Sequence, residues 1–276
     1  MREGPPILAA RRLGRGLLNA AAGLSLAFIL TPLVFVSWLA FFRQEVPSFP
    51  PEGYTLRWFA NILGERAFVS GFLLSLEVGV AATALGLALG VPASLCLARF
   101  RFPGREAINT LLLLPLVVPG VVLGTSIYLS HIELEIDTGW PLTGSLAGLV
   151  IGHVLLVIPW SVRLVTASFV GLDHALEEAA QNLGANPWIT FWRVTLPAIR
   201  PGIVAAGLFG FVASFGNLEM SLFLVGPGRT TLPIAILQYL EWKIDPTIAA
   251  VSVIQILFIA AALVMTDRYV KLARVV

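Results

Sequence analysis

Charged residues are scarce in this chain. Asp, Glu, Lys and Arg make up only 12% of its 276 residues, whereas 57% are hydrophobic. A soluble domain carries about 25% charged residues, because charge must cover its surface. An ordinary soluble domain is therefore excluded, and much of the surface must face lipid. The formal net charge of +2 gives no reason to expect a nucleic acid partner.

Chemically active residues are rare as well. Cys96 is the single cysteine, so neither an internal disulfide nor a thiolate metal cluster can form. Neither of the two lysines, Lys243 and Lys271, follows a glycine, so the sequence has no P-loop to hold the phosphates of ATP. The three histidines lack metal-ligand spacing, and HExxH and GxSxG sequences are missing. We expect no catalytic residues, no metal and no cofactor in this chain.

Long apolar runs are abundant. A helix needs about 20 apolar residues to cross the hydrocarbon core of a membrane. Six runs qualify: Leu17–Phe42, Phe68–Ala98, Ile108–Leu129, Gly144–Val162, Ile203–Val225 and Thr247–Met265. The predicted fold class is an all-α membrane protein with six transmembrane helices, and residues 1–276 form a single transmembrane domain. The first run is too long for a cleavable signal peptide, so the N-terminus is expected to stay attached.

The distribution of basic residues predicts the orientation, because Lys and Arg near the membrane are retained in the cytoplasm. With the N-terminus inside, 13 of the 18 basic residues are cytoplasmic. They are Arg2, Arg11, Arg12, Arg15, Arg99, Arg101, Arg105, Arg163, Arg193, Arg200, Arg268, Lys271 and Arg274. The predicted topology is therefore N-in and C-in. The outer segments are then 43–67, 130–143 and 226–246, and the inner ones are 99–106 and 167–202.

The larger inner segment contains a pattern of short helices over residues 173–201. Asp173 is a candidate N-cap, and Gly184 ends the first helix. Asn186-Pro187 then caps a second short helix, which Leu196-Pro197 is expected to stop. The first helix has one apolar face, made of Leu176, Ala179, Ala180 and Leu183. This face either packs on the protein's own membrane helices or enters a groove on another protein.

The spacing within this segment is distinctive. Glu178-Ala179-Ala180 is followed after three residues by Gly184, after nine more by Val194, and then by Leu196-Pro197. This pattern resembles the EAA loop of permease subunits in binding-protein-dependent ABC importers. The resemblance implies a type I importer transmembrane domain in which Glu178, Ala179, Ala180, Gly184, Leu196 and Pro197 form the ATPase-coupling loop.

The same resemblance implies the partners. ATP and Mg²⁺ would be bound by a separate pair of ATPase subunits, and the chain itself would be a transport subunit rather than an enzyme. A sister permease, more often a different chain than a second copy, would complete the membrane pair. An external or periplasmic binding protein would deliver the solute, and the location would be the bacterial inner membrane. An ion-gradient-driven secondary transporter is the alternative of a different class, and a membrane scaffold is a third.

Motifs elsewhere extend the resemblance to the spermidine/putrescine branch of these permeases. They are Pro51 to Phe59, Arg101 to Arg105, Ser221 to Leu224, Thr231 to Pro233 and Asp245-Pro246. The resemblance favours a polyamine as the solute, with amino acid-derived amines, phosphonates, opines or ferric iron as alternatives.

Two carboxylates lie deep within apolar runs, Glu77 and Glu219. A charge inside a membrane is costly unless it is paired or hydrated, so both are candidates for a solute path, together with Asn217 and Ser214. Gly216 and Asn217 stand where such permeases would be expected to have acids. Glu77 could instead reach the membrane interface. His153, in the middle of a run, is predicted to be a packing residue whose hydrogen bonds are satisfied.

Overall fold

The computed structural model describes residues 5–270, with side chains described from residue 14 to residue 268. Arg2, Lys271 and Arg274, which contribute to the predicted orientation, lie outside the described residues. Two compact units make up the chain: Met1–Gly64 with Trp242–Gln255, and Glu65–Glu241 with Ile256–Val276. In the described part, five helices are long and apolar enough to cross a membrane, or six if one bent pair counts as a single span.

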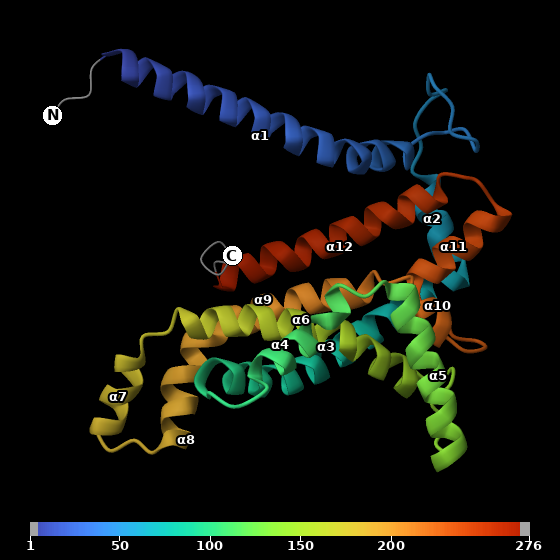
Figure 1. Ribbon diagram of the computed structural model, residues 1–276. Helices are drawn as coiled ribbons and strands as arrows, with labels where there is room; N and C mark the ends of the chain where they lie inside the picture. The colour runs from blue at the N-terminus through green and yellow to red at the C-terminus, as the bar shows by residue number, and fades with distance from the viewer. Residues whose placement is uncertain (1–4, 271–276) are drawn as a thin grey trace. The chain divides into compact units, whose positions relative to one another are not determined.

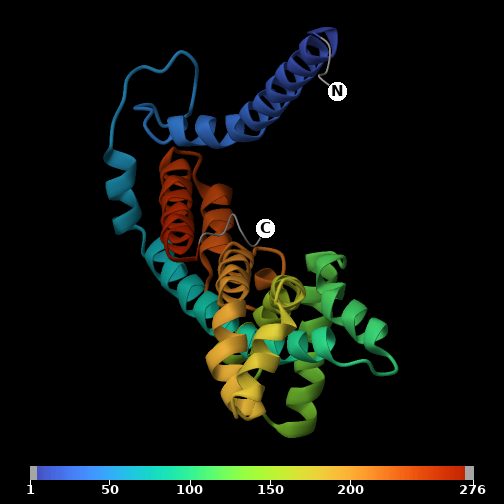
Figure 2. The same cartoon turned by 90° about the vertical axis from the view of Figure 1, so that its left-hand side faces the viewer.

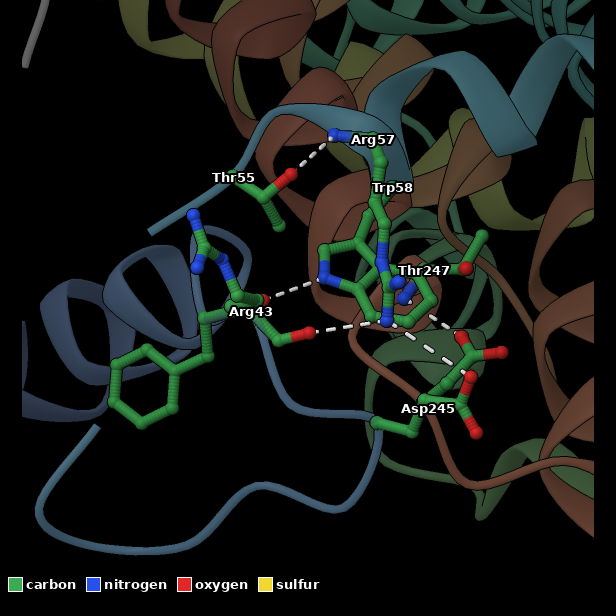
Figure 3. Close-up of polar contacts among 8 residues, drawn as sticks. Arg43, Thr55, Arg57, Trp58, Asp245 and Thr247 are labelled. Atoms are coloured by element: carbon green, nitrogen blue, oxygen red, sulfur yellow. Dashed lines mark hydrogen bonds and ion pairs between the residues drawn. The ribbon is translucent and has the colours of Figure 1, made fainter. Parts of the chain in front are cut away.

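The first unit contains α1 (Pro5–Leu39) and α2 (Arg57–Gly64), joined by a loop that polar contacts hold in place. The indole N–H of Trp58 donates to the backbone carbonyl of Phe42 at 2.6 Å, and Arg57 donates to the carbonyl of Arg43 at 3.0 Å. Figure 3 shows these contacts together with Thr55, whose hydroxyl accepts from the backbone N–H of Arg57. The predicted outer segment 43–67 therefore has a defined structure of its own.

Three long helices form the core of the second unit: α3 (Arg66–Arg99), α6 (Leu146–Val170) and α9 (Leu196–Phe215). They run beside one another in Figures 1 and 2. Glycines permit this close approach. A Cβ on Gly86 would lie 2.5 Å from Val157, and one on Gly90 would lie 2.3 Å from Ser161. The side chains of Val157 and Ser161 on α6 therefore lie directly against the glycine backbone of α3.

The third predicted span, 108–129, is not one straight helix. α4 (Arg105–Leu113) and a 3-10 turn, η1 (Leu114–Leu116), are followed by α5 (Gly120–Thr138), with a bend of 106° at the break. Pro119 causes the break, because proline removes a helical N–H and pushes the residue before it out of the α conformation. The predicted end of this span at Leu129 is also wrong, since α5 continues to Thr138.

The fifth predicted span, 203–225, is wrong at both ends. α9 ends at Phe215, five non-helical residues follow, and a short helix, α10 (Ser221–Leu224), comes next. Asn217 favours this break, because its side chain accepts a hydrogen bond from the backbone N–H of Met220 at 2.9 Å. The predicted outer segment after it contains α11 (Leu232–Trp242), and α12 (Thr247–Val270) covers the sixth predicted span.

The inner segment is more helical than expected. α6 continues to Val170, eight residues beyond its predicted end. α7 (His174–Asn182) and α8 (Pro187–Thr190) follow, and a π turn, η2 (Phe191–Thr195), leads directly into α9. The prediction that Leu196-Pro197 stops a helix is therefore wrong. Proline lacks the N–H that would bond to the carbonyl four residues earlier, and the wider π turn, in which the Leu196 N–H bonds to the Phe191 carbonyl, accommodates that loss.

Candidate functional site

The helix α7 is formed by local signals. The Asp173 carboxylate accepts the backbone N–H of Ala175 at 3.0 Å, which caps the start of the helix. After its end, Gly184 has a φ of +90°, a left-handed conformation that suits glycine and lets the chain reverse direction. Asn186 then accepts the N–H of Ile189 at 2.8 Å, and Pro187 occupies the first turn of α8. The predicted helix, turn and helix are confirmed.

The apolar face of α7 is uncovered. Leu176 is 55% exposed and Leu183 is 90% exposed, while Ala179 is exposed and Ala180 is partly buried. α7 and α8 project beyond the ends of α6 and α9 (Figure 1). The interpretation in which this face packs on the protein's own helices is therefore wrong for the described part of the chain. What remains is a small apolar surface that another molecule could cover.

Adjacent glutamates on α7 have opposite environments. Glu178, which the resemblance selects, is exposed, whereas the side chain of Glu177 is only 6% exposed. The Glu177 carboxylate accepts hydrogen bonds from the Arg99 guanidinium, at the end of α3, and from the Thr195 hydroxyl, in the π turn. Sequence reasoning missed these three residues. The available signal was two adjacent acids, which on a helix point in different directions.

Burial raises the pKa of the Glu177 carboxyl, but hydrogen bonds from Arg99 and Thr195, together with the positive charge of Arg99, outweigh this effect. The net result is a pKa below the ordinary value of 4.5. His174 lies near the same carboxylate, with its Nδ1 3.6 Å from Oε2. At neutral pH, Glu177 is thus an ionised and paired residue.

A second candidate site lies where two helix breaks meet. Glu219 belongs to the non-helical segment between α9 and α10, and its carboxylate lies over Gly120, the first residue of α5 after the 106° bend. A helix N-terminus carries partial positive charge, which favours a carboxylate there. Irregular backbone at membrane depth is tolerated only where it is buried in protein or lines a water-filled cavity. Glu219 is exposed, so it is not enclosed by the part of the chain that the structure describes.

A buried hydrogen-bond network centred on His153 connects the two ends of the non-helical segment between α9 and α10. His153, which is 1% exposed, lies with Nδ1 2.8 Å from the Ser214 hydroxyl and Nε2 3.0 Å from the Ser221 hydroxyl. Ser221 donates to the carbonyl of Asn217 at 2.7 Å, so it must accept from His153 Nε2–H, and Nδ1 accepts from Ser214. The prediction that His153 is a satisfied packing residue is confirmed. The Ser214 hydroxyl and the Asn217 side-chain oxygen thus both have hydrogen-bond partners within the protein.

The remaining candidates are placed apart from these residues. Glu77 lies on the exposed side of α3, and among the described residues it forms no hydrogen bond or ion pair with Ser214, Asn217 or Glu219. Leu196 and Pro197 form the first turn of α9, where Leu196 packs against the core formed by Val165, Phe169, Ile199 and Ala206. The candidate path residues thus separate into a connected segment, 214–219, and Glu77 alone.

Comparison with known proteins gives consistent matches. Residues 82–274, more than half of the chain, match the binding-protein-dependent transport system inner membrane component family. The putrescine transport system permease PotI of Escherichia coli K12 is 30% identical over 230 residues, covering 83% of this chain and 82% of PotI. The molybdenum transport system permease ModB of Mycobacterium tuberculosis is 34% identical over 259 residues and 90% of each chain. The putative 2-aminoethylphosphonate permease PhnV of Salmonella paratyphi A is 27% identical over 261 residues, covering 93% of this chain and 95% of PhnV.

Solved structures share the fold. A chain of a bacterial ABC transporter that imports the acidic polysaccharide alginate superposes with a TM-score of 0.70 at 14% identity, covering 98% of this chain and 99% of that one. A chain of the inward-facing MetNI methionine ABC transporter gives a TM-score of 0.62 at 19% identity, covering 76% of this chain and 97% of that one. The chain therefore belongs to the family of binding-protein-dependent transport system inner membrane components, the permease subunits of ABC importers.

Proposed function

We propose that this permease subunit couples ATP hydrolysis on a separate ATPase to solute movement through the docking of α7. The observation that carries the proposal is the uncovered apolar face of α7, with Leu183 90% exposed, next to the left-handed turn at Gly184. Ala179 and Ala180 have small side chains, so the helix can lie close to the floor of a groove on another protein. ATP and Mg²⁺ would be held by the paired ATPase subunits, so this chain contributes no hydrolytic residues.

The chain is a multi-pass protein of the inner membrane. We infer six spans if the bent pair of α4–η1 and α5 is counted as one, with both termini in the cytoplasm. The basic residues support this orientation, because those at the α7 end of the second unit include Arg99, Arg163 and Arg193. The exposed face of α7 would then lie on the cytoplasmic side, where an ATPase is accessible.

The solute path would pass Glu219. Its carboxylate is exposed at the meeting of two helix breaks, an arrangement that in transporters places polar backbone and charge along an aqueous route. Asn217 and Ser214 would shape this segment through their hydrogen bonds rather than contact the solute. Glu77, on the exposed side of α3, would line the route at a position separate from residues 214–219.

A polyamine is the solute that we favour, because Glu219 would attract a cation and because PotI is named for putrescine transport. Other relatives are named for 2-aminoethylphosphonate and for molybdenum, so these solutes are alternatives to a polyamine. We further propose a sister permease of different sequence and an external solute-binding protein as the remaining partners.

The docking proposal is tested with two glycine variants of the same loop. Gly184→Ala places a side chain at a φ of +90°, which costs about 1–2 kcal/mol for an L residue and distorts the turn. Gly171→Ala is the matched control, because Gly171 has a φ of −80° and a new Cβ would meet only ordinary contacts at 3.7 Å or more. We expect Gly184→Ala to lower copurification with the ATPase and ATP-dependent uptake, and Gly171→Ala to retain both.

Charge reversal provides a second test. Glu178→Arg changes an exposed residue on α7, so the protein should still reach the membrane in normal amount while ATP-dependent uptake is lost. Normal uptake by both Gly184→Ala and Glu178→Arg would refute docking through α7. Uptake that follows an ion gradient and does not need ATP would instead support the secondary transporter.

A further inference from the structure

Glu177 holds α7 to the rest of the protein. It is the one residue of α7 that is buried, whereas the apolar side chains of Leu176 and of Leu183, just after the helix, are exposed. Apolar packing therefore does little to fix the position of this helix. A nine-residue helix joined to its neighbours by short turns would otherwise be free to pivot.

The partners of Glu177 belong to α3 and to the π turn that precedes α9. Arg99 is the last residue of α3, and its guanidinium also lies 5.7 Å from the centre of the Phe169 ring, near the end of α6. Thr195 is the last residue of the π turn that leads into α9, and it is 1% exposed. Arg99, Glu177 and Thr195 thus join α7 to all three helices of the core, and we call this set the latch.

Each component of the latch suits a mechanical link. A buried carboxylate that accepts from a guanidinium and a hydroxyl is held in a defined direction, whereas an apolar contact can slide. α3, α6 and α9 pack closely around the buried residues Val165, Phe169, Ile199 and Ala206. A displacement of α7 would therefore move the cytoplasmic ends of these helices together, rather than bend the turns beside α7.

We propose that the latch of Arg99, Glu177 and Thr195 transmits the movement of α7 to α3 and α9, so that these three residues act as positioning residues in transport. The proposal rests on the docking function of α7 proposed above. It goes further because it assigns the transmission of this movement to residues that lie outside the exposed apolar face of α7. Docking and transmission are then separable: the exposed face binds the ATPase, and the latch converts that binding into movement of the membrane helices.

The first experiment needs no ATPase. Spin labels on Cys96, the single native cysteine, and on a Gln181→Cys substitution would report the distance between α3 and α7 by EPR in the full chain. Both residues are exposed. We expect a narrow distance distribution in the otherwise native chain, a broad one with Glu177→Gln, and recovery in the double variant Arg99→Glu with Glu177→Arg. Equal widths with and without Glu177→Gln would overturn the latch.

The second experiment measures transport per ATP hydrolysed in liposomes that contain the complete importer, with putrescine as the probe. We expect Glu177→Gln and Arg99→Gln to copurify normally with the ATPase and to lower this ratio about tenfold. Arg101→Gln is the matched control, because Arg101 is exposed near the same end of α3. The charge-swapped double variant should recover part of the loss. A ratio unchanged in Glu177→Gln would overturn the proposal.

These measurements distinguish the two proposals. Failure of the native chain to copurify with the ATPase would refute docking, while the EPR widths would still test the latch. A merely structural role for Glu177 would lower the amount of complex, so uptake and ATP hydrolysis would fall in proportion and their ratio would stay constant. That constant ratio, like equal EPR widths, would overturn transmission through the latch.

Discussion

The Glu219 carboxylate occupies the space that a side chain on Gly120 would need. A Cβ added to Gly120 would lie 2.1 Å from Oε2 of Glu219 and 3.0 Å from its Cβ. Gly120 begins α5 after the bend, and Glu219 lies in the gap between α9 and α10. The two helix breaks are therefore complementary: one supplies the acid and the other supplies the space for it.

Gly120→Ala should displace the Glu219 carboxylate while the helices stay in place, because the nearest atom is the end of a flexible side chain. We expect uptake of putrescine to fall about tenfold. The measurement is uptake into liposomes with the thermal unfolding midpoint recorded in parallel. Gly23→Ala is the control, since a Cβ at Gly23 would meet nothing within 4 Å. Native uptake by Gly120→Ala would show that the position of Glu219 does not matter.

Glu219→Gln removes the charge and keeps the shape. If the carboxylate attracts a cationic solute, uptake of putrescine should fall about tenfold, while ATP hydrolysis without solute stays near the native rate. Glu77→Gln should be tested beside it, because Glu77 lies on the exposed side of α3, apart from this segment. Unchanged uptake and unchanged solute-stimulated ATP hydrolysis in Glu219→Gln would reassign Glu219 to a structural role.

His153→Leu should destabilise the segment behind Glu219. The substitution leaves the hydroxyls of Ser214 and Ser221 without their shared partner in a buried place, at a cost of about 1–3 kcal/mol. We expect a lower unfolding midpoint in detergent and a milder decrease for Ser214→Ala. Ser126→Ala is the control, because its exposed hydroxyl bonds only to the carbonyl of Val122 in its own helix. A native midpoint for His153→Leu would contradict the network.

Acid should release α7. The folded pKa of Glu177 lies below the ordinary value of 4.5, so its contribution to stability is complete above that value and is lost as the pH falls through the folded pKa. Hydrogen exchange of the peptides that cover 173–201, corrected for intrinsic rates, should show less protection at about pH 3 than at neutral pH. Glu177→Gln should show low protection at both values. Protection of the native segment that does not change with pH would refute this prediction.

Local signals in the sequence predicted much of the structure of residues 173–201. Asp173, Gly184 and Asn186-Pro187 act on backbone atoms within a few residues, so the caps and the turn around α7 could be identified without a structure. Glu177 could not, because its partners Arg99 and Thr195 are 78 and 18 residues away along the chain. Whether a helical side chain is buried depends on what packs against it, and the residues next to it in the sequence do not indicate those contacts.

Composition predicted the membrane location, but it did not predict where the helices end or break. Apolar content indicated that the chain crosses a membrane, and the spacing from Glu178 to Pro197 carried the resemblance to its family. Hydropathy could not show that the run 203–225 is broken after Phe215, because Leu218 and Met220 are as apolar outside a helix as within one. Only the tertiary structure decided that break, that Pro119 turns the chain by 106°, and that Gly120 meets Glu219. The reason is physical: apolar runs report the solvent around a segment, whereas the angle of a bend and the pairing of distant residues depend on packing between separate parts of the chain.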